Sequence, residues 1–584
     1  MRISPVTSRN SGVLYRPQKT MFVNGWWYFR GAQNANLRTT CTTTHFVSRA
    51  AGTTDHPGGR TEPRAPSEIA GHRPHRINGP HRCTSRPLAR PLAGALVLVS
   101  ALTVTQLAGE DAPTGASSSA VGGPLGHSGR WITDARGRVV ILHGLNMVNK
   151  RAPYTPAAAG FGATAAKTLA DDGFDVVRLG VLYQSVEPRP GVFNRRYLRS
   201  IAKTVAQLAR HGVYSLLDFH QDEMNQEFGG EGFPTWSVET DGLPVQHYVF
   251  SQGYLESPAL DRAYDNFWTD QQGRGGVGLQ QRYVAAWEQV ARQFAGDPWV
   301  LGYDLFNEPW PADGTAAELA SFYTKTIAGI RSVDRRHLIW YEPYVTFDYG
   351  IQTQLPSFSD RLLGMSFHDY CLGNAEQEPT TCAASEKTTV ANALAHSAST
   401  GVALMMTEFG ATDDYGDLGR VMDIADAHQL PWIEWAYCGC DDPTGTIPPR
   451  TEALVYNPAR PGTGTNVNLV KLQLLAEPYP RVVSGTPLSY TFDQTTRTFR
   501  LVYTTKAPDG HRFGAGACTA VIVPPVQYPT GYRVKVDGGR VLSRTGAGVL
   551  QVGSTGGHDT VSVTVTPDGH GRTTDAGPVP ASCT

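Results

Sequence analysis

The stretch Val300-Leu-Gly-Tyr-Asp-Leu-Phe-Asn-Glu-Pro309 is an apolar run that ends in polar residues. The same arrangement occurs seven more times between residues 139 and 437, and segments with helical periodicity, such as 197–211 and 316–333, lie between the runs. Near-continuous apolar strands that alternate with helices indicate a parallel sheet covered on both faces. Eight such units predict an α/β fold, a (β/α)8 TIM barrel. The runs are 139–146, 176–183, 214–220, 300–307, 337–342, 362–368, 402–408 and 432–437.

Polar side chains gather at the carboxyl ends of these predicted strands. That end of a (β/α)8 barrel carries the active site, although the fold alone does not indicate the chemistry. Glu434 precedes Trp435 by one residue and should point toward the helices, so we expect a structural role for it. The residues at or near the strand ends are Asn146, His220, Asn307, Glu308, Glu342, His368, Tyr370, Glu408 and Trp435.

Two of these residues form a candidate catalytic pair. Glu308 ends the fourth strand and Glu408 ends the seventh, each after an apolar run, so both carboxylates should emerge into the barrel mouth. Glycoside hydrolysis requires such a pair, in which one carboxyl group protonates the leaving oxygen and the other attacks the sugar or activates water. We assign Glu308 as the acid, because the neighbouring Asn307 can hold a sugar hydroxyl, and Glu408 as the nucleophile. The alternative is two solvated or salt-bridged strand ends.

The motifs Leu305-Phe-Asn-Glu-Pro309 and Thr407-Glu-Phe-Gly410 resemble those of glycoside hydrolase family 5, the cellulase-like retaining barrels. More narrowly, the chain resembles the endoglycoceramidases of that family over roughly residues 130 to 565. The resemblance implies a retaining mechanism with Glu308 as acid/base and Glu408 as nucleophile. It also implies cleavage of the bond between an intact oligosaccharide and ceramide. The supporting stretches are His143-Gly-Leu-Asn-Met-Val-Asn-Lys150, Leu217-Asp-Phe-His-Gln-Asp222, Ala263-Tyr-Asp-Asn-Phe-Trp268 and Glu477-Pro-Tyr-Pro-Arg481.

The same resemblance implies which residues contact the substrate, and their chemistry suits that role. Lys150 and Asp222 can bond sugar hydroxyls, and Trp435 offers a flat face to a pyranose ring. Tyr370 can orient the nucleophile and Asn307 can hold the 2-hydroxyl. For His220 and Trp435 the alternative is core packing, and His368 is included on weaker grounds. The implied substrate-binding residues are Lys150, His220, Asp222, Asn307, Tyr370, Trp435 and His368.

No metal or other cofactor is expected. A metal-dependent barrel hydrolase needs a His-x-His pair on the first strand, and His143 stands alone there.

A long segment with little regular pattern, residues 223–262, follows Asp222. A loop of that length in a compact barrel is usually a binding element. If its apolar side chains are exposed at the barrel mouth, they would suit a lipid-linked aglycone. The alternative is that they pack the loop onto the barrel. These residues are Met224, Phe228, Phe233, Trp236, Tyr248, Phe250 and Tyr254.

The remainder of the chain divides around the catalytic barrel, to which we assign residues 129–478. In residues 479–584 the helical periodicity is absent, and alternating segments at 488–492 and 498–503 flank a hairpin pattern, so an antiparallel β-sandwich is expected. No tryptophan follows Trp435, which favours a packing role for this module over carbohydrate binding by stacking.

Residues 1–128 are expected to be a basic, disordered extension and linker. The first 90 residues carry 14 Lys and Arg against 3 Asp and Glu, and a short apolar segment at about 91–107 follows them. This order is typical of a secretory signal and too short to span a bilayer comfortably. Our hypothesis is that translation starts downstream of Met1 and that the mature chain keeps no stable membrane span. The alternative is a genuine basic arm with an internal anchor.

Composition narrows the class of protein further. A chain that is 40% hydrophobic and 18% charged is globular rather than disordered or fibrous. Residues 91–584 carry 37 Lys and Arg against 49 Asp and Glu, and this acidic charge argues against binding nucleic acid. Export makes disulfides possible, with Cys371–Cys382 and Cys518–Cys583 as plausible pairs. Cys438 and Cys440 are too close in sequence for easy pairing.

These observations favour a secreted, extracellular, monomeric glycosidase that acts on glycosphingolipids at a membrane or micelle surface. One alternative is a β-glucosidase or endoglucanase of the same family that acts on another lipid glycoside or on a polysaccharide. A second is a non-catalytic glycolipid-binding protein, which the presence of both carboxylates disfavours.

Overall fold

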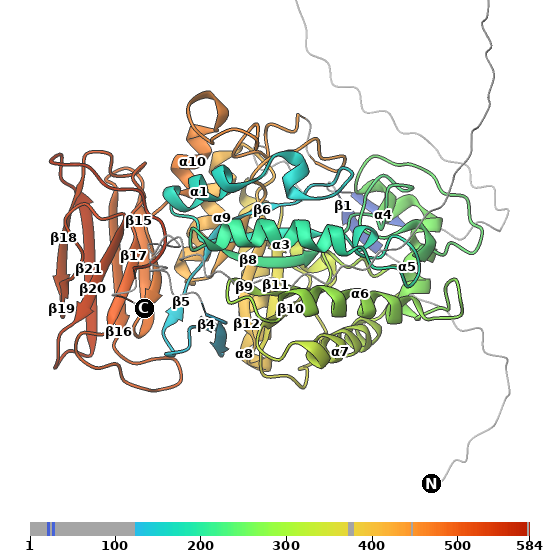
Figure 1. Cartoon of the computed structure of the whole chain (residues 1–584), viewed down its shortest axis with the longest axis horizontal. Coiled ribbons are helices and arrows are strands. Elements are labelled where there is room, and N and C mark those ends of the chain that lie inside the picture. Colours follow the sequence, from blue (N-terminus) through green and yellow to red (C-terminus); the bar gives the residue numbers. More distant parts are fainter. Residues whose placement is uncertain are drawn as a thin grey trace, which may run out of the picture. The chain divides into compact units, whose positions relative to one another are not determined.

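The computed structural model describes residues 20–23, 26–29, 123–371, 379–445, 448–580 and 583 (Figure 1). Most of the predicted N-terminal extension, including the signal-like segment at 91–107, lies outside these residues. Within the extension, β1 (Thr20–Val23) and β2 (Trp26–Phe29) pair with each other. Among the helices of the described part, none is both long enough and apolar enough to cross a bilayer.

Eight parallel strands close into a barrel, which confirms the predicted fold class. The strands follow one another around the barrel in chain order, and the circle closes where Trp432 pairs with His143 and Glu434 with Leu145. The barrel strands are β6 (His143–Met147), β7 (Val176–Val181), β8 (Tyr214–Phe219), β9 (Val300–Asp304), β10 (Leu338–Tyr341), β11 (Leu363–Asp369), β12 (Ala403–Phe409) and β13 (Trp432–Glu434).

Amphipathic helices between the strands cover the outside of the barrel (Figure 1). In α3 the side chain of Asn194 accepts a hydrogen bond from the Tyr197 N–H at the helix start, and residues spaced three or four apart, from Leu198 to Leu208, are buried. The covering helices are α1 (Ala163–Asp172), α3 (Arg195–Ala209), α6 (Leu279–Phe294), α7 (Ala316–Val333), α8 (Pro379–Thr400), α9 (Tyr415–Ala427) and α10 (Leu469–Leu475).

The connections after the strands contain further short elements. The longest connection, between β8 and α6, contains η2, α4 and α5. These elements are η1 (Pro156–Ala159), α2 (Tyr183–Val186), η2 (Thr235–Ser237), α4 (Gln252–Glu256), α5 (Pro258–Trp268), η3 (Val345–Tyr349) and η4 (Gly464–Asn466).

The C-terminal residues form two antiparallel sheets, as expected for a β-sandwich. A single apolar core includes residues of both sheets, among them Val521 and Val563. The predicted hairpin is β15 (Thr486–Asp493) paired with β16 (Thr498–Thr504), and β21 (Thr560–Pro567) and β18 (Tyr532–Asp537) complete that sheet. The other sheet contains, in order, β19 (Gly539–Val541), β20 (Val549–Ser554), β17 (Cys518–Ile522), β14 (Tyr479–Val483), β5 (Val139–Val140), β4 (Trp131–Thr133) and β3 (Gly126–Ser128).

The predicted first barrel run, 139–146, is therefore divided between two sheets. Val139 and Val140 pair with Val483 and Val482 of β14, and the barrel strand begins only at His143. An apolar run cannot reveal this division, because residues buried in either sheet have the same character.

The segment Glu477-Pro-Tyr-Pro-Arg481 joins the barrel to the second sheet. Nε of Arg481 lies 2.8 Å from the Asp175 carboxylate, and the Tyr479 hydroxyl donates to the carbonyl of Gly173. The His143 ring stacks on both Trp432 and Tyr479, and burial holds the pKa of His143 well below its usual range. These contacts agree with the predicted packing role of the C-terminal module.

Three disulfides are present among the described residues, and two of them were expected. The Cys371–Cys382 and Cys518–Cys583 pairs are confirmed. The prediction for Cys438 and Cys440 was wrong, because these two residues are bonded to each other. Gly439 and the left-handed backbone of Cys440, with φ of 46°, turn the chain so that the two Cα atoms are 5.2 Å apart, a distance that a disulfide spans.

Candidate active site

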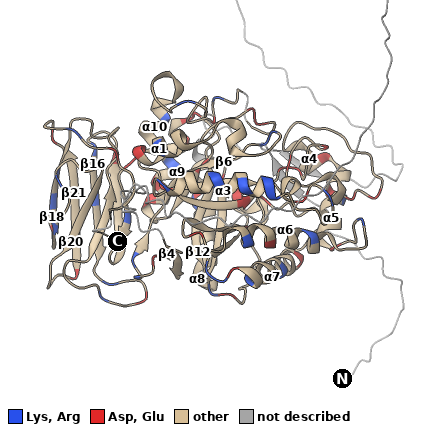
Figure 2. Ribbon diagram, viewed as in Figure 1, with Lys and Arg blue, Asp and Glu red and all other residues tan. Residues whose placement is uncertain are grey.

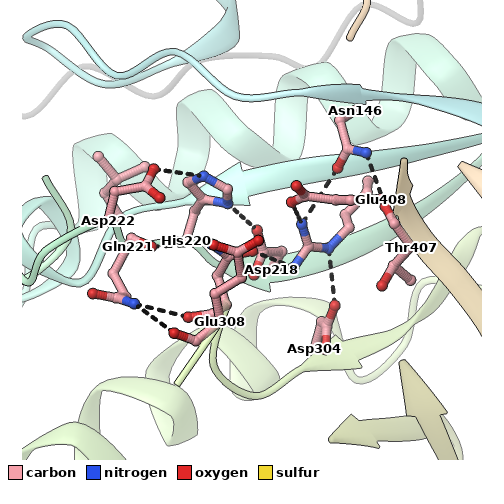
Figure 3. A network of polar contacts seen from close by, with 12 residues as sticks. Asn146, Asp218, His220, Gln221, Asp222, Asp304, Glu308, Thr407 and Glu408 are labelled. Atoms are coloured by element: carbon pink, nitrogen blue, oxygen red, sulfur yellow. Dashed lines mark hydrogen bonds and ion pairs between the residues drawn. The ribbon is translucent and has the colours of Figure 1, made fainter. Parts of the chain in front are cut away.

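The nine predicted site residues meet at the carboxyl end of the barrel strands, where Figure 3 shows part of their polar network. Most of them are buried, and Glu308 and Tyr370 are half-buried. Ion pairs, hydrogen bonds and ring contacts join all nine into one connected group, together with Asp218 and Arg178. The nine are Lys150, His220, Asp222, Asn307, Glu308, His368, Tyr370, Glu408 and Trp435.

The two candidate catalytic carboxylates face each other across His368. Nδ1 of His368 is 2.9 Å from Oε1 of Glu308 and 3.7 Å from Oε2 of Glu408. The separation of these two carboxylate oxygens therefore cannot exceed the sum of the two distances. This limit favours the spacing of about 5 to 5.5 Å of retaining glycosidases over the roughly 6.5 to 9.5 Å of inverting enzymes.

The surroundings of Glu308 favour its protonated form. Burial raises the pKa of Glu308, the hydrogen bond from His368 opposes this rise, and the charges of Glu408 and Asp222 add to it. Although burial alone would lower the pKa of His368, the charges of Glu342 and Glu408 and its hydrogen bonds raise it well above its usual range. A charged imidazolium thus lies beside a carboxyl group whose pKa is raised, and a raised pKa suits a proton donor.

Glu408 is held by donors on two sides. The Tyr370 hydroxyl donates to Oε2 of Glu408 at 3.0 Å, and Nη1 of Arg178 contacts Oε1. Burial and the charge of Glu408 raise the pKa of Tyr370 well above its usual range, so its hydroxyl remains a donor. The predicted role of Tyr370, which is to orient the Glu408 carboxylate, requires such a hydrogen bond.

Arg178, at the centre of the network, is a residue that the sequence analysis missed. It lies on β7 and is completely buried. Its Nη2 also lies 2.9 Å from Oδ1 of Asn307, so one guanidinium contacts both the Glu408 carboxylate and the amide beside Glu308. The available signal was that Arg178 is the only Lys or Arg in the eight apolar runs. Its carboxylate partners are Asp218, Asp304, Glu342 and Glu408.

The backbone around Glu308 is fixed by two further side chains. Gln221, also missed, donates to the carbonyl of Asn307 at 2.9 Å and receives a hydrogen bond at its own carbonyl from the Asn307 amide. Glu342 accepts from the Glu308 N–H at 2.8 Å, and Glu308 itself has a φ of 42°. Three hydrogen bonds thus stabilise a backbone conformation that a non-glycine residue rarely adopts.

A second charged group surrounds Lys150. Its Nζ lies 2.6 Å from Oδ2 of Asp222, 3.1 Å from Oδ2 of Asp442 and 4.6 Å from the centre of the Trp435 ring. The His220 ring stacks on the Trp435 ring, with 5.3 Å between the two ring centres. Burial would lower the pKa of Lys150, but the surrounding carboxylates raise it well above its usual range. Asp442 follows the Cys438–Cys440 disulfide, and the sequence analysis did not identify it.

Two groups of side chains in the described part have the donor atoms of a metal site, namely His220, Asp222 and Glu231, and Glu308, Asp348 and His368. In the first group Lys150 already supplies the positive charge. Burial lowers the pKa of His220, but the charge and hydrogen bond of Asp218 raise it to about 10. A protonated imidazole has no lone pair for a metal. The first group is therefore arranged as ion pairs with Lys150 and His220, and in the second group His368 pairs with Glu308.

The long loop after β8 is mainly packed onto the barrel. Met224, Phe228, Phe233 and Tyr254 are buried, and Trp236, Tyr248 and Phe250 are half-buried. For the buried four, this supports packing over contact with a lipid. Glu434 has the expected structural position, since its buried carboxylate lies 3.0 Å from Nζ of Lys471.

The central guanidinium gives a first prediction. Arg178→Lys should lower kcat by roughly 10²- to 10³-fold, because an ammonium group cannot contact Glu408, Asn307 and Glu342 at once. Turnover of a soluble aryl lactoside would be measured together with the melting temperature. Arg481→Lys is the matched control, since it removes a buried guanidinium from Asp175 outside the site and should alter stability without altering kcat. A kcat for Arg178→Lys within threefold of the parent value would contradict this role.

Comparisons with known proteins agree with this geometry. Residues 133–441 match the cellulase family (glycosyl hydrolase family 5), and residues 478–565 match the glycoside hydrolase family 5 C-terminal domain. Endoglycoceramidase I of Rhodococcus hoagii (strain 103S) is 28% identical over 482 residues, which cover 78% of this chain and 90% of that protein. The endoglycoceramidase of Cyanea nozakii is 28% identical over 424 residues, which cover 64% and 80% respectively.

Solved structures show the same similarity. Endo-glycoceramidase II from Rhodococcus sp., solved as a lactosyl-enzyme intermediate, superposes with a TM-score of 0.63 at 27% identity and covers 74% of this chain and 99% of that one. The complex of the same enzyme with ganglioside GM3 gives a TM-score of 0.62 at 26% identity, with 75% and 99% covered.

Proposed function

Because this chain belongs to glycosyl hydrolase family 5 and is a glycoside hydrolase, we propose that it cleaves glycosphingolipids between the oligosaccharide and ceramide with retention of configuration. The observation that carries the proposal is that the carboxylates of Glu308, which follows β9, and Glu408, in β12, both lie near one nitrogen of His368. The ceramide-linked substrate is supported by the similarity to endoglycoceramidases and to a structure with bound ganglioside.

In the first step, the carboxylate of Glu408 attacks the anomeric carbon of the sugar attached to ceramide. The carbon–oxygen bond to ceramide breaks, and Glu308 transfers its proton to the departing oxygen, which releases ceramide. Tyr370 and Arg178 hold Glu408 in line for the attack. The covalent intermediate parallels the lactosyl-enzyme species captured in Endo-glycoceramidase II.

In the second step, Glu308 acts as a base. It removes a proton from water while the water oxygen attacks the same carbon, and the bond to Glu408 breaks to release the oligosaccharide. The imidazolium of His368 stabilises the ionised form of Glu308 between the two steps. We infer that Asn307, held by Arg178, bonds the sugar 2-hydroxyl and that Lys150, Asp222 and Trp435 bind the glycone.

The test is mass spectrometry after incubation of the full chain with a ganglioside in mild detergent. We expect the whole oligosaccharide and free ceramide in equal amounts, and no products with the Glu408→Ala protein. Release of single terminal sugars would contradict the proposed bond. If several glycosphingolipid series remain intact while an aryl glucoside or a glucan is cut, the lipid assignment fails and the barrel chemistry stands.

We further propose that the protein is secreted. The signal-like segment at about 91–107 and the three disulfides of the described part support export, since disulfides persist in oxidising compartments. Immunodetection in the culture medium and in washed source cells tests this proposal. Retention of all of the protein inside the cells would contradict it.

A further inference from the structure

An uncharged, exposed loop lies within the connection between β8 and α5. Residues 242–255 contain no Asp, Glu, Lys or Arg in a chain that is 18% charged. Figure 2 shows this part of the ribbon, which leads into α4, without charged residues. Leu243, Val245 and Val249 are 38%, 37% and 72% exposed. Single exposed aliphatic residues are ordinary, but three within seven residues leave a patch of apolar surface in water.

Aromatic side chains on both sides of Val249 fix the tip of the loop. The Tyr248 hydroxyl donates to the carbonyl of Glu256 at 3.3 Å. The Phe250 ring packs edge-on against the buried ring of Tyr254, with 6.3 Å between the ring centres. Val249 is thus held outward by neighbours that are themselves anchored.

The same loop is connected to the acid/base residue. The Tyr254 ring centre is 5.1 Å from that of Trp310, which stands two residues after Glu308. The Trp310 indole donates to the Asp261 carboxylate at 3.1 Å and is thereby fixed. The acid protonates the oxygen of the leaving group, so the aglycone lies on the Glu308 side of the site. Through Tyr254 the uncharged loop therefore packs against the segment that carries the acid/base residue.

We propose that residues 242–250 enter the apolar boundary of a lipid surface and dock the enzyme on it. This inference rests on the proposed function and deepens it, since the ceramide chains of the substrate remain in the membrane and the bond to be cut lies at its surface. The loop has no charge to desolvate, and Leu243, Val245 and Val249 gain free energy when their exposed surface leaves water. Tyr248 has the apolar ring and polar tip of an interfacial residue.

A fluorophore at the loop tip tests insertion directly. In the full chain, Cys41 and Cys83, the two cysteines that the three disulfides of the described residues do not include, are replaced by serine, and Val249→Cys is labelled with a polarity-sensitive dye. Addition of phosphatidylcholine vesicles without glycolipid should shift the emission to the blue. The same dye on Leu542→Cys, at a 41% exposed position beside β19, is the control and should not respond. Equal responses at both positions, or none at Val249→Cys, would overturn the proposal. A shift that grows with protein concentration without lipid would indicate a second copy of the chain and would also overturn it.

Kinetics separate this proposal from the proposed function. Leu243→Ser/Val249→Ser should lower kcat/KM at least about tenfold for ganglioside in phosphatidylcholine vesicles and leave a soluble aryl lactoside unaffected. The matched control, Val541→Ser/Leu542→Ser, removes the same two residue types, which are 42% and 41% exposed. It should leave kcat/KM unchanged for both substrates. Equal loss on both substrates, or no loss on vesicles, would overturn docking. If the parent protein cleaves no ganglioside but its labelled loop inserts, the substrate assignment fails and docking stands.

Discussion

Glu408→Ala is expected to lower kcat/KM for every β-glycoside substrate by about 10⁵-fold or more, because no other group can form the covalent intermediate. The measurement is turnover of ganglioside and of an aryl lactoside by purified protein of unchanged melting temperature. Glu434→Gln is the matched control, since Glu434 is an equally buried glutamate whose partner, Lys471, lies outside the site. It should lower stability and preserve kcat.

Azide distinguishes a missing nucleophile from a damaged site. Removal of the Glu408 side chain leaves space below the anomeric carbon, in which azide can attack an activated aryl lactoside directly. A single displacement inverts the configuration, so the expected product is the α-lactosyl azide, identified by proton NMR. Formation of the β-azide, or turnover of Glu408→Ala at more than 1/100 of the parent rate, roughly three orders of magnitude above expectation, would contradict the assignment.

Glu308→Gln is expected to have a large effect that depends on the leaving group. With ganglioside, kcat/KM should fall by roughly 10³- to 10⁴-fold, because the ceramide alkoxide cannot depart without a proton. With a dinitrophenyl lactoside, whose leaving group needs no acid, kcat/KM should fall less than about tenfold. Azide should then attack the trapped intermediate without a base and give the β-lactosyl azide. An equal loss on both substrates would contradict the acid role.

The pH dependence of the activity tests the same assignment, and the direction of the expected change is defined. Burial raises the pKa of Glu308, so the parent activity, which needs the protonated acid, should persist above the usual range of a carboxyl group and then fall as pH rises through that raised pKa. In Glu308→Gln this alkaline decline should be absent from the residual hydrolysis of ganglioside. Its persistence would assign the titration to another group.

The strand order of the barrel and the meeting of Glu308 and Glu408 at one end of it were predictable for a physical reason. A parallel strand buried on both faces must be apolar throughout, so the exceptions at its carboxyl end, such as Glu308 and Glu408, are conspicuous in sequence. The same alternation placed Glu434 on the outer side, where its carboxylate does bond Lys471.

Residues that act through tertiary contacts were not predictable. Arg178 lies in the middle of a strand, and its four carboxylate partners come from three other strands and the end of a fourth. Asp442 contacts Lys150 from a loop that carries the Cys438–Cys440 disulfide, a bond that the sequence did not predict. Apolar character alone could not separate the buried Phe233 from the exposed Val249, because both follow the same strand in the same loop.

The pairing of β5 with β14 has a consequence for dividing the protein. The strand that precedes the barrel and the strand that follows it belong to one sheet, so the backbone is fastened where the catalytic barrel begins and ends. A fragment cut at residue 478 would leave β5 as an open edge, with unpaired amides of the kind that promote aggregation. The accessory module therefore holds the two ends of the catalytic barrel together. Shorter versions of the enzyme are better made by trimming edge strands such as β19 than by removing the module.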